Sequence, residues 1–329
     1  MLVTGANGQL GSELAEALVA RFGHDAIVTS DIVSKPCVQG VIHETLDVTN
    51  FNALKGIVAK HRITQVYHLA AALSAAGESR PLWAWDLNMR GLLNVLEVAR
   101  ENALDRVFWP SSIAAFGPTS PRDSAPQQTT MEPCTIYGVS KLAGEGLCRW
   151  YHRHHGVDVR SLRYPGLISW KTLPGGGTTD YAVEIFHAAL QRSRYTCFLE
   201  PDQALPMMYM EDALRATIEL MEAPSDSLGE RGGYNISGMT FTPAQIGAEI
   251  AQHIPGFQID YLPDFRQAIA QSWPRSVNDD AARQDWGWSP RFDLPMMAAS
   301  MLSNLSDANT GLSAAVIDMP RSGDAYQRT

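Results

Sequence analysis

The sequence has few cysteines, and none of them is spaced as a metal or redox motif. The four are Cys37, Cys134, Cys148 and Cys197, and no two of them form a Cys-x-x-Cys pair. This excludes a zinc knuckle and a thioredoxin-type site. So small a number in a chain of 329 residues also excludes a disulfide-stapled scaffold.

Long apolar runs and an excess of positive charge are also missing. No stretch of about 18 uncharged apolar residues occurs, so we expect no membrane span. The formal net charge is -9, opposite in sign to the basic field of a nucleic-acid binder. Met1–Thr4 runs directly into a glycine turn without a signal-peptide pattern. We therefore expect a soluble, cytoplasmic protein.

Patterns for metal binding are absent as well. His152, His154 and His155 cluster, but Arg153 lies among them at the end of an expected helix. Imidazoles in that place are favoured by the negative end of the helix dipole, which explains them without a metal. No His-Glu-x-x-His motif occurs, and we expect no metal site.

What the sequence does contain is a repeated alternation of strand and helix. Short apolar segments alternate with segments whose apolar residues recur at helical spacing. Repeats of this kind predict an α/β fold with a doubly wound parallel Rossmann sheet. The expected strands are residues 1–4, 26–30, 41–46, 65–69, 106–110 and 157–164, and the expected helices are residues 9–21, 51–61, 83–101 and 137–152.

A glycine-rich loop follows the first expected strand and opens the first helix. Its glycines, Gly5, Gly8 and Gly11, are spaced as G-x-x-G-x-x-G. Glycine is needed where a turn takes positive φ and where the backbone must touch a pyrophosphate, and the helix N-terminus then offers free N–H groups. We expect the loop to bind a dinucleotide through Gly5, Asn7, Gly8, Gln9, Leu10 and Gly11.

Acidic residues follow the second and third expected strands. Asp31 comes 20 residues after Gly11, where a carboxylate accepts hydrogen bonds from the adenosine ribose and repels a 2′-phosphate. No arginine accompanies it, only Lys35, so NAD is favoured over NADP. Asp47 and Val48 are expected near the adenine, although Asp47 could equally cap the helix that follows.

Tyr137 and Lys141 are four residues apart at the start of an expected helix, so they share one face. An ammonium one turn from a phenol is expected to lower its pKa, which makes the phenolate a competent base for a substrate hydroxyl. Ser111 and Ser112 precede them at a strand end, where α/β sheets bind ligands, and a hydroxyl there can hold the reacting oxygen.

Together these pieces resemble the extended short-chain dehydrogenases/reductases, the class that contains the UDP-galactose epimerases. The matching segments are TGANGQLG, Asp31, Asp47-Val48, His68-Leu69-Ala70-Ala71, Asn88, Ser112 and Tyr137-x-x-x-Lys141. The resemblance implies that Tyr137 is the acid/base, that Lys141 holds the ribose and tunes Tyr137, that Ser112 orients the substrate oxygen, and that Asn88 supports a proton relay. It also implies contacts to NAD from Leu69, Ala70, Ala71, Asn88, Tyr137, Lys141, Tyr164 and Leu167. Phe116 departs from the commoner tyrosine, which should affect packing rather than chemistry.

Segments of the second half resemble the L-threonine 3-dehydrogenases of the short-chain type. They are residues 173–184, 163–169 and 272–276. The resemblance implies a site for a small zwitterion, whose carboxylate needs hydroxyl or N–H donors and whose ammonium needs carboxylate or π density. The expected substrate contacts are Ser74, Ser111, Ser112, Tyr137, Thr178, Thr179, Asp180 and Trp273. Two purely structural interpretations stay open: the segment Thr178–Asp180 could cap a helix, and Trp273 could belong to the core.

The expected domains are interleaved along the chain. Residues 1–165 and 206–237 are expected to form the NAD-binding domain, and residues 166–205 and 238–305 a smaller, mixed substrate-binding domain. Residues 306–329 are expected to be a tail of weak or no structure. The resemblance suggests a homodimer through helices 83–101 and 137–152.

The favoured function is NAD-dependent oxidation of L-threonine to 2-amino-3-oxobutanoate, with Tyr137 phenolate as base and hydride passing to the nicotinamide C4. The resemblance implies that the product passes to a CoA ligase or is lost by decarboxylation. The alternative is a nucleotide-sugar epimerase or dehydratase of the same class, against which the glycine-rich loop before Asp180 argues. A non-catalytic dinucleotide sensor is a third reading, but it would need neither Tyr137 nor Lys141.

Overall fold

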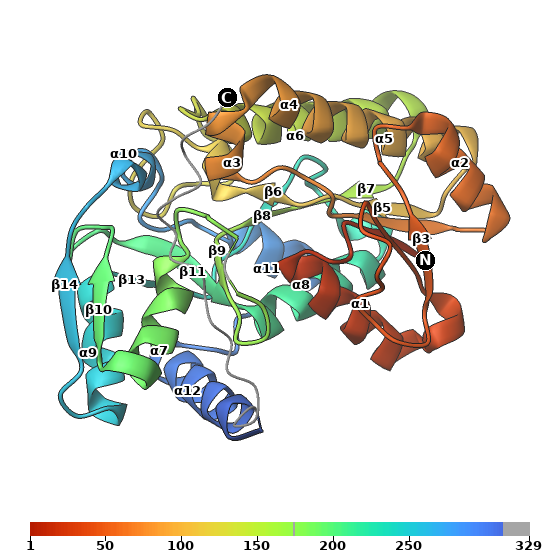
Figure 1. Cartoon of the computed structure of the whole chain (residues 1–329). Coiled ribbons are helices and arrows are strands. Elements are labelled where there is room, and N and C mark those ends of the chain that lie inside the picture. The colour runs from red at the N-terminus through yellow and green to blue at the C-terminus, as the bar shows by residue number, and fades with distance from the viewer. Residues whose placement is uncertain (174, 312–329) are drawn as a thin grey trace, which may run out of the picture.

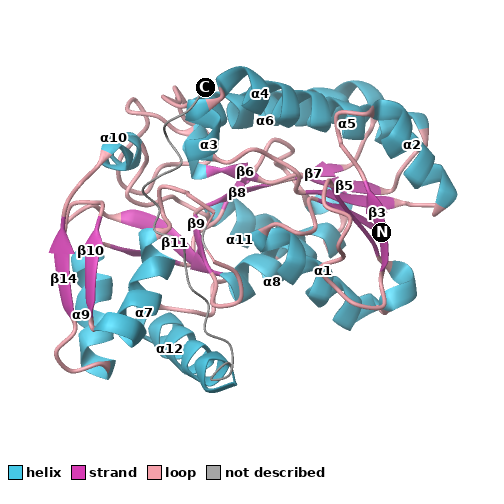
Figure 2. Cartoon of the chain, in the orientation of Figure 1, coloured by secondary structure: helices cyan, strands magenta, loops and turns pink. Residues whose placement is uncertain are grey.

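A parallel sheet organises the first half of the chain. The structure is a computed structural model, and it describes residues 1–173 and 175–311. Within these residues six strands form a parallel sheet in the order β3-β2-β1-β4-β5-β7, which confirms the expected doubly wound sheet. Its strands β3, β5 and β7 are labelled in Figure 2. The strands are β1 (Leu2–Thr4), β2 (Val28–Asp31), β3 (Ile42–Thr45), β4 (Gln65–His68), β5 (Arg106–Phe108) and β7 (Val159–Arg160).

A second ladder extends this sheet at its far edge. β6 (Ser111–Ser112) pairs with β8 (Leu162–Tyr164), which pairs in turn with β12 (Tyr234–Asn235). The single strand expected over 157–164 is therefore two short strands, β7 and β8, separated by Ser161. The break sends the chain from pairing with β5 to pairing with β6, which lies closer to the site described below.

Helices cover both faces of the parallel sheet (Figure 1). α2, α4, α5 and α6 lie on one face, and α1, α8 and α11 on the other. A π-helical segment (Asp86–Arg90) joins α4 and α5, so the helix expected over 83–101 begins earlier and is locally wider. The bounds are α1 (Gln9–Phe22), α2 (Phe51–Lys60), α3 (Ser74–Ser79), α4 (Pro81–Trp85), α5 (Gly91–Glu101), α6 (Ile136–His155), α8 (Met210–Glu222) and α11 (Asp280–Trp286).

The rest of the described chain forms a smaller mixed region with its own apolar core. Its sheet has the order β13-β11-β9, with β11 parallel to β9 and antiparallel to β13. Thr242 caps α9, where it and Gln245 exchange backbone and side-chain hydrogen bonds. The elements are β9 (Gly166–Ile168), β10 (Arg194–Cys197), β11 (Leu205–Tyr209), β13 (Met239–Phe241), β14 (Gln258–Tyr261), α7 (Tyr181–Arg192), α9 (Pro243–His253), α10 (Phe265–Ser272) and α12 (Leu294–Gly311).

Three expected boundaries differ from the structure. β11 was assigned to the first domain from residue 206, but it pairs with strands of the smaller region, so the return begins at α8. Trp286 and Trp288 were assigned to the second domain, but they pack in the core shared by α1 and α8. α12 continues through Gly311, so the tail expected from residue 306 begins as a helix, and its remainder lies outside the described residues.

No helix among the described residues is long and apolar enough to cross a membrane. No group of three or more His, Cys, Asp or Glu side chains gathers there in a way that could hold a metal ion.

Candidate functional site

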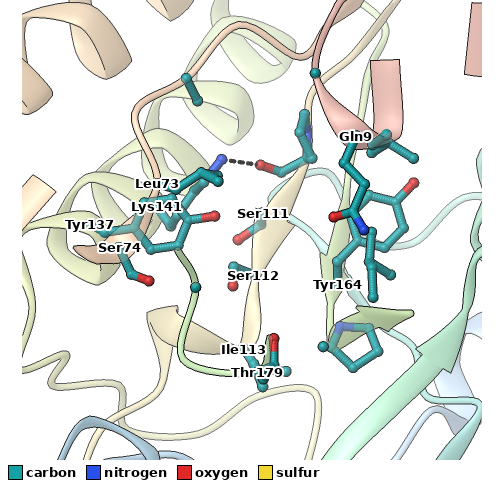
Figure 3. A pocket seen from close by; sticks show the side chains of 18 of the residues that line it. Gln9, Leu73, Ser74, Ser111, Ser112, Ile113, Tyr137, Lys141, Tyr164 and Thr179 are labelled. Atoms are coloured by element: carbon teal, nitrogen blue, oxygen red, sulfur yellow. Dashed lines mark hydrogen bonds between the residues drawn. The ribbon is translucent and has the colours of Figure 1, made fainter. Parts of the chain in front are cut away.

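A cavity of about 280 Å³ lies where the strand order reverses, between β1 and β4. Crevices at such switch points, beyond the carboxyl ends of parallel strands, are where open α/β sheets bind ligands. Figure 3 shows Tyr137, Lys141 and Ser74 on one side, the two serines of β6 in the middle, and Gln9 and Tyr164 opposite. The expected site residues that line it are Gly5, Gly8, Gln9, Leu10, Gly11, Leu69, Ala71, Ser74, Ser111, Ser112, Tyr137, Lys141, Tyr164, Leu167, Thr179, Asp180 and Trp273.

The glycine loop forms one end of the cavity and depends on its glycines. Gly5 has a φ of 67°, and a Cβ on it would lie 2.6 Å from the Ala70 nitrogen. A Cβ on Gly11 would lie 2.2 Å from the Gly5 carbonyl oxygen. No side chain caps the N-terminus of α1 at Gly8, so its first backbone N–H groups remain for an anion. The residues present thus fit the pyrophosphate of a dinucleotide.

Asp31 lies at the end of β2, as expected, but outside the lining of the cavity. Its carboxylate accepts backbone hydrogen bonds from Asn7 (3.0 Å) and Val33 (3.1 Å). The Asn7 side chain donates to the Lys35 carbonyl (2.9 Å). Asp31 and Asn7 therefore hold the glycine loop against the loop after β2, at the end where a ribose would meet the sheet.

The other expected adenine contacts also lie outside the lining. Asp47 is exposed and accepts hydrogen bonds from the backbone and hydroxyl of Thr49 (2.9 and 2.7 Å). The helix cap is Asn50, which accepts from Ala53, so the capping reading of Asp47 is wrong. Val48 is buried, with its side chain against Gly91 of α5.

Tyr137 and Lys141 lie on the first turns of α6, which Thr135 caps by accepting from the Gly138 nitrogen. Both side chains face the cavity, as does Ser112 of β6. The Lys141 ammonium donates to the Pro110 carbonyl at 2.6 Å and lies 5.3 Å from the centre of the Tyr137 ring. The structure thus brings the expected serine, tyrosine and lysine to one wall.

The electrostatics of this wall differ from the expectation. Burial raises the pKa of Tyr137 to about 12, and a side-chain hydrogen bond with Ser112 opposes the rise. Burial also lowers the pKa of Lys141 to about 7, while Cys148 and Glu145 oppose that fall. The expected lowering of the tyrosine pKa by the lysine is therefore wrong for this environment, because loss of solvent dominates both groups.

Asn88 lies in the π-helical segment and outside the cavity lining, although it was expected to touch the cofactor. Its side-chain oxygen accepts from the Ala72 nitrogen (2.8 Å), and its amide nitrogen donates to the Ala72 carbonyl and to the Ser140 hydroxyl (3.1 Å). Ser140 in turn donates to the Tyr137 carbonyl (2.7 Å). Asn88 thus ties the segment after β4 to the first turn of α6.

Two serines at the site have different surroundings. Ser111 lines the cavity, but its hydroxyl donates to the Glu145 carboxylate at 2.7 Å, away from the substrate contact expected of it. Ser74 is buried at the start of α3 and also lines the cavity. Of the two hydroxyls, that of Ser111 is already committed to the protein interior.

The wall from the smaller region carries Thr179, Asp180 and Trp273. Asp180 precedes α7, and its carboxylate accepts from the nitrogens of Gly176 (2.7 Å) and Gly177 (2.5 Å). It therefore holds the glycine loop, and no side chain caps α7. Burial raises the pKa of Asp180, which the two backbone hydrogen bonds oppose.

Thr178 is also buried, but it does not line the cavity, and its hydroxyl has no hydrogen-bond partner among the described residues. Trp273 belongs to the core of the smaller region and also lines the cavity, so the core interpretation and the substrate-contact interpretation are compatible.

Sequence reasoning missed several lining residues that carry no ionisable group. They share a position directly beside an expected site residue, which is the signal that could have found them. They are Leu73, Pro110, Ile113, Pro165, Gly166 and Gly177. Apolar side chains and glycines at such positions shape the cavity without adding chemistry to it.

The chain belongs to the NAD-dependent epimerase/dehydratase family, whose model matches residues 1–237. A GalE-like L-threonine dehydrogenase from Cupriavidus necator, in its holo form, is 64% identical with a TM-score of 0.92, over 92% of this chain and 99% of that one. A monomeric L-threonine 3-dehydrogenase from a metagenome is 48% identical with a TM-score of 0.91, over 94% and 99% of the two chains.

A curated relative gives the same picture from sequence. The mitochondrial L-threonine 3-dehydrogenase of Bos taurus is 49% identical over 307 residues, which are 92% of this chain and 82% of the relative. These likenesses confirm the resemblance to the extended short-chain class and to its threonine dehydrogenase branch. The family also makes a nicotinamide dinucleotide the expected cofactor.

Proposed function

We propose that this chain oxidises L-threonine at its side-chain hydroxyl, with NAD as the cofactor. The observation that carries the proposal is that Tyr137 and Ser112 face the same cavity as the glycine cradle. When bound, oxidised NAD supplies the hydride acceptor and a positive ring. The glycine loop of Gly5, Gly8 and Gly11 would hold its pyrophosphate, because backbone N–H groups are available there.

Tyr137 is the base in this proposal. Its oxygen takes the proton of the substrate hydroxyl, and the Ser112 hydroxyl holds the oxygen that becomes a carbonyl. Because burial raises the pKa of Tyr137 to about 12, its deprotonation needs positive charge nearby. The ring of bound NAD would supply that charge, and Lys141 on the next turn of α6 adds to it while its ammonium is protonated.

The opposite wall suits a small amino acid. The Thr179 hydroxyl is available for the substrate carboxylate, and the Trp273 ring and the Asp180 carboxylate offer π density and negative charge for its ammonium. Ser74 offers a further hydroxyl from the wall that carries Tyr137 and Lys141. We further propose that residues 1–165, with α8 and β12, bind the cofactor, and that residues 166–205, with β13, α9, β14 and α10, bind the substrate.

Asp31 supports NAD over NADP. Its carboxylate ends β2 beside the glycine loop, where a 2′-phosphate would meet its negative charge. Lys35 contacts Asn7 only through its backbone carbonyl. Within the described residues, no lysine or arginine side chain is hydrogen-bonded to the Asp31 carboxylate. We expect a CoA ligase to consume the product, because a free 2-amino-3-oxo acid would otherwise be lost by decarboxylation.

We also propose a homodimer through the outer face of α4, α5 and α6. Leu82, Trp83, Trp85, Val139 and Trp150 are exposed on it, and apolar side chains gathered on adjoining helices favour association. Light scattering after size exclusion should give twice the mass of 36.0 kDa. A mass of one chain at micromolar concentration would contradict this, and the similar metagenome enzyme is described as monomeric.

The decisive experiment mixes the protein with NAD and either L-threonine or UDP-galactose. The proposal expects reduced nicotinamide to accumulate with L-threonine and no sugar epimerisation. An epimerase would convert the UDP-sugar without net reduction of NAD. A protein that binds NAD but turns over neither compound would support the sensor reading and remove the proposed function.

A further inference from the structure

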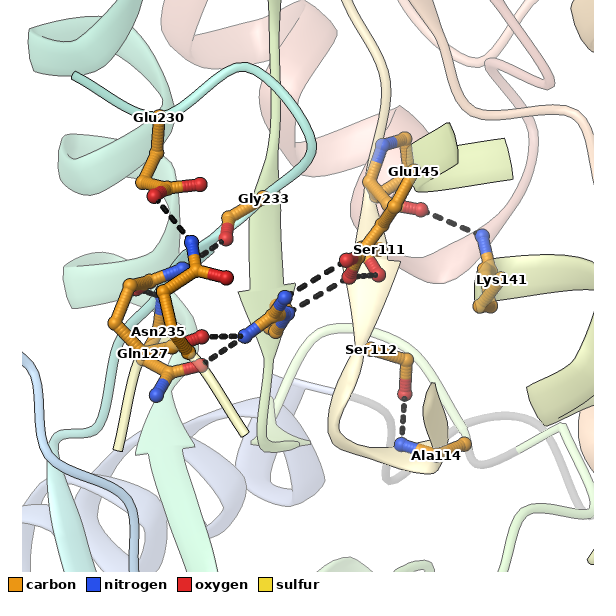
Figure 4. A network of polar contacts seen from close by, with 12 residues as sticks. Ser111, Ser112, Ala114, Gln127, Lys141, Glu145, Glu230, Gly233 and Asn235 are labelled. Atoms are coloured by element: carbon orange, nitrogen blue, oxygen red, sulfur yellow. Dashed lines mark hydrogen bonds and ion pairs between the residues drawn. The ribbon is translucent and has the colours of Figure 1, made fainter. Parts of the chain in front are cut away.

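A fully buried ion pair lies directly behind the serine wall of the cavity (Figure 4). Arg163 of β8 and Glu145 of α6 are each at most 1% exposed. Arg163 Nε donates to one carboxylate oxygen at 2.7 Å and its terminal nitrogen to the other at 2.8 Å. A carboxylate and a guanidinium in this paired geometry fix each other in both distance and orientation.

The pair is joined to the cavity through Ser111. The Ser111 hydroxyl donates to the same Glu145 oxygen that accepts from Arg163 Nε. Ser111 and Arg163 are also direct partners in the pairing of β6 with β8. Glu145 lies one turn after Lys141 on α6, so its carboxylate links the strand of Ser112 to the helix of Tyr137 and Lys141.

The same arginine reaches toward the opposite wall. Its remaining terminal nitrogen donates to the Gln127 carbonyl (2.9 Å) and to the Asn235 side-chain oxygen (3.0 Å). Asn235 donates onward to the carbonyls of Ala125 and Asn278 (both 3.1 Å). Asn278 belongs to residues 273–278, a segment that begins with Trp273 of the cavity and pairs with residues 122–125.

Close packing leaves this cluster little room to move. A Cβ on Gly233, which precedes β12, would lie 3.2 to 3.3 Å from Glu145, Arg163 and Ser111 together. The Phe116 ring lies 5.3 Å from the Arg163 guanidinium carbon on another side. A buried polar network whose groups are all paired is rigid, and rigid packing transmits a displacement rather than absorbing it.

We propose that Glu145 and Arg163 are positioning residues for this reaction, which hold Ser112, Tyr137 and Trp273 in register across the cavity. The inference rests on the proposed function for its catalytic readout. Stability alone is a poor explanation of the pair, because desolvating two charges offsets most of their attraction. A displacement of about 1 Å at a reacting group lowers turnover by about 100-fold, which is the effect such a pair would prevent.

The experiment is a double-mutant cycle on Ser111 and Glu145. We expect Ser111→Ala to lower kcat about 10-fold and Glu145→Gln about 50-fold, with KM for L-threonine and NAD changed less than about 3-fold. Because Ser111 acts through Glu145, the double variant should be no slower than Glu145→Gln. Effects that multiply, or that fall on KM, would overturn the proposal.

Matched variants separate positioning from loss of folding. Arg149→Met removes a cation that approaches Glu145 from outside at 3.5 Å without touching Ser111, so kcat should change less than about 2-fold. Arg163→Lys keeps the charge but cannot make the four contacts, so it should lower kcat as Glu145→Gln does. Normal activity of Arg163→Lys would contradict the proposal.

A readout without turnover separates this inference from the proposed function. Hydrogen exchange followed by mass spectrometry should show residues 273–278 exchanging at least about 10-fold faster in Glu145→Gln, or in Arg163→Lys if that variant alone folds. Exchange in α9 should stay as in the unchanged protein. If the unchanged protein fails to oxidise L-threonine, the proposed function falls, and this exchange result alone decides the inference. Unchanged exchange over 273–278 would overturn it.

Discussion

The two walls of the cavity are built on different principles. The first wall carries Ser112, Tyr137 and Lys141. It is formed by the carboxyl ends of adjacent parallel strands and the helices that follow them, so its residues come from short motifs. The second wall uses Gly166, Thr179 and Trp273, which lie on separate segments of the smaller region. Register of the sheet fixes the first wall, whereas packing of loops fixes the second, which makes the second the natural place for substrate choice.

The charges of the walls differ in the same way. On the first wall Lys141 is buried and Tyr137 is half-buried, and loss of solvent moves both pKa values toward the neutral form. On the second wall the Asp180 carboxylate is held by two backbone N–H groups of its own loop. The first wall therefore carries ionisable groups whose pKa values a bound positive charge can change, whereas the second wall mainly determines the shape of the cavity.

The largest effect should come from Tyr137, the proposed base on the first wall. Tyr137→Phe keeps the ring but removes the proton acceptor, so turnover should fall about 1000-fold or more. NAD affinity, measured by calorimetry, should change little, because the glycine cradle is untouched. A variant that keeps more than a tenth of the activity would show that another group accepts the proton.

The buried lysine should reveal itself in stability against pH. Its folded pKa of about 7 lies below the usual 10.5, so the unfolded chain binds more protons between these values, and stability rises with pH across that window. Lys141→Met should therefore be more stable than the unchanged protein by about 1–3 kcal/mol near pH 6, and the gain should shrink toward pH 10. Urea unfolding at several pH values, without added nucleotide, measures this. A gain that is constant with pH would contradict it.

A smaller effect is expected on the second wall. Thr179→Val removes a hydroxyl from the cavity without changing its shape, so KM for L-threonine should rise about 10-fold while KM for NAD stays constant. Thr178→Val is the matched control, because that hydroxyl is buried outside the lining and without a partner among the described residues. Equal KM changes in both variants would remove the distinction between the two threonines.

The smallest effect should come from Asp31, which contacts the glycine loop but lies outside the lining of the cavity. Asp31→Asn keeps oxygen and shape but loses the negative charge, so the preference for NAD over NADP should fall about 3- to 10-fold. Initial rates with each nucleotide measure the ratio. An unchanged ratio would mean that the acidic charge does not select the cofactor.

The motifs of the first half were sufficient to predict most of the first wall. The glycine loop, Ser112, Tyr137 and Lys141 are set by local sequence and by strand ends, so they gather as expected. The sequence placed Asn88 and Ser111 near the site but could not predict their hydrogen bonds. Their partners, Ala72, Ser140 and Glu145, are set by how the helices pack. The tyrosine pKa was misjudged for the same reason, since spacing on a helix shows proximity and does not show burial.

The second half was less predictable. Its strands β9, β11 and β13 join across long stretches of chain, and nothing local marks β11 as part of the smaller sheet. The same holds for Trp286 and Trp288, whose core lies with α1 and α8.

Local patterns in the sequence specify the parallel sheet, the glycine loop and the residues proposed to react, because each depends on periodicity, glycine freedom or a short spacing. Tertiary structure alone decided which hydroxyls face the cavity, how far burial moves the pKa values of Tyr137 and Lys141, and that Arg163 and Glu145 meet behind the serines. Those properties arise from contacts between segments distant in the chain, where desolvation and packing, rather than local preference, set the energy.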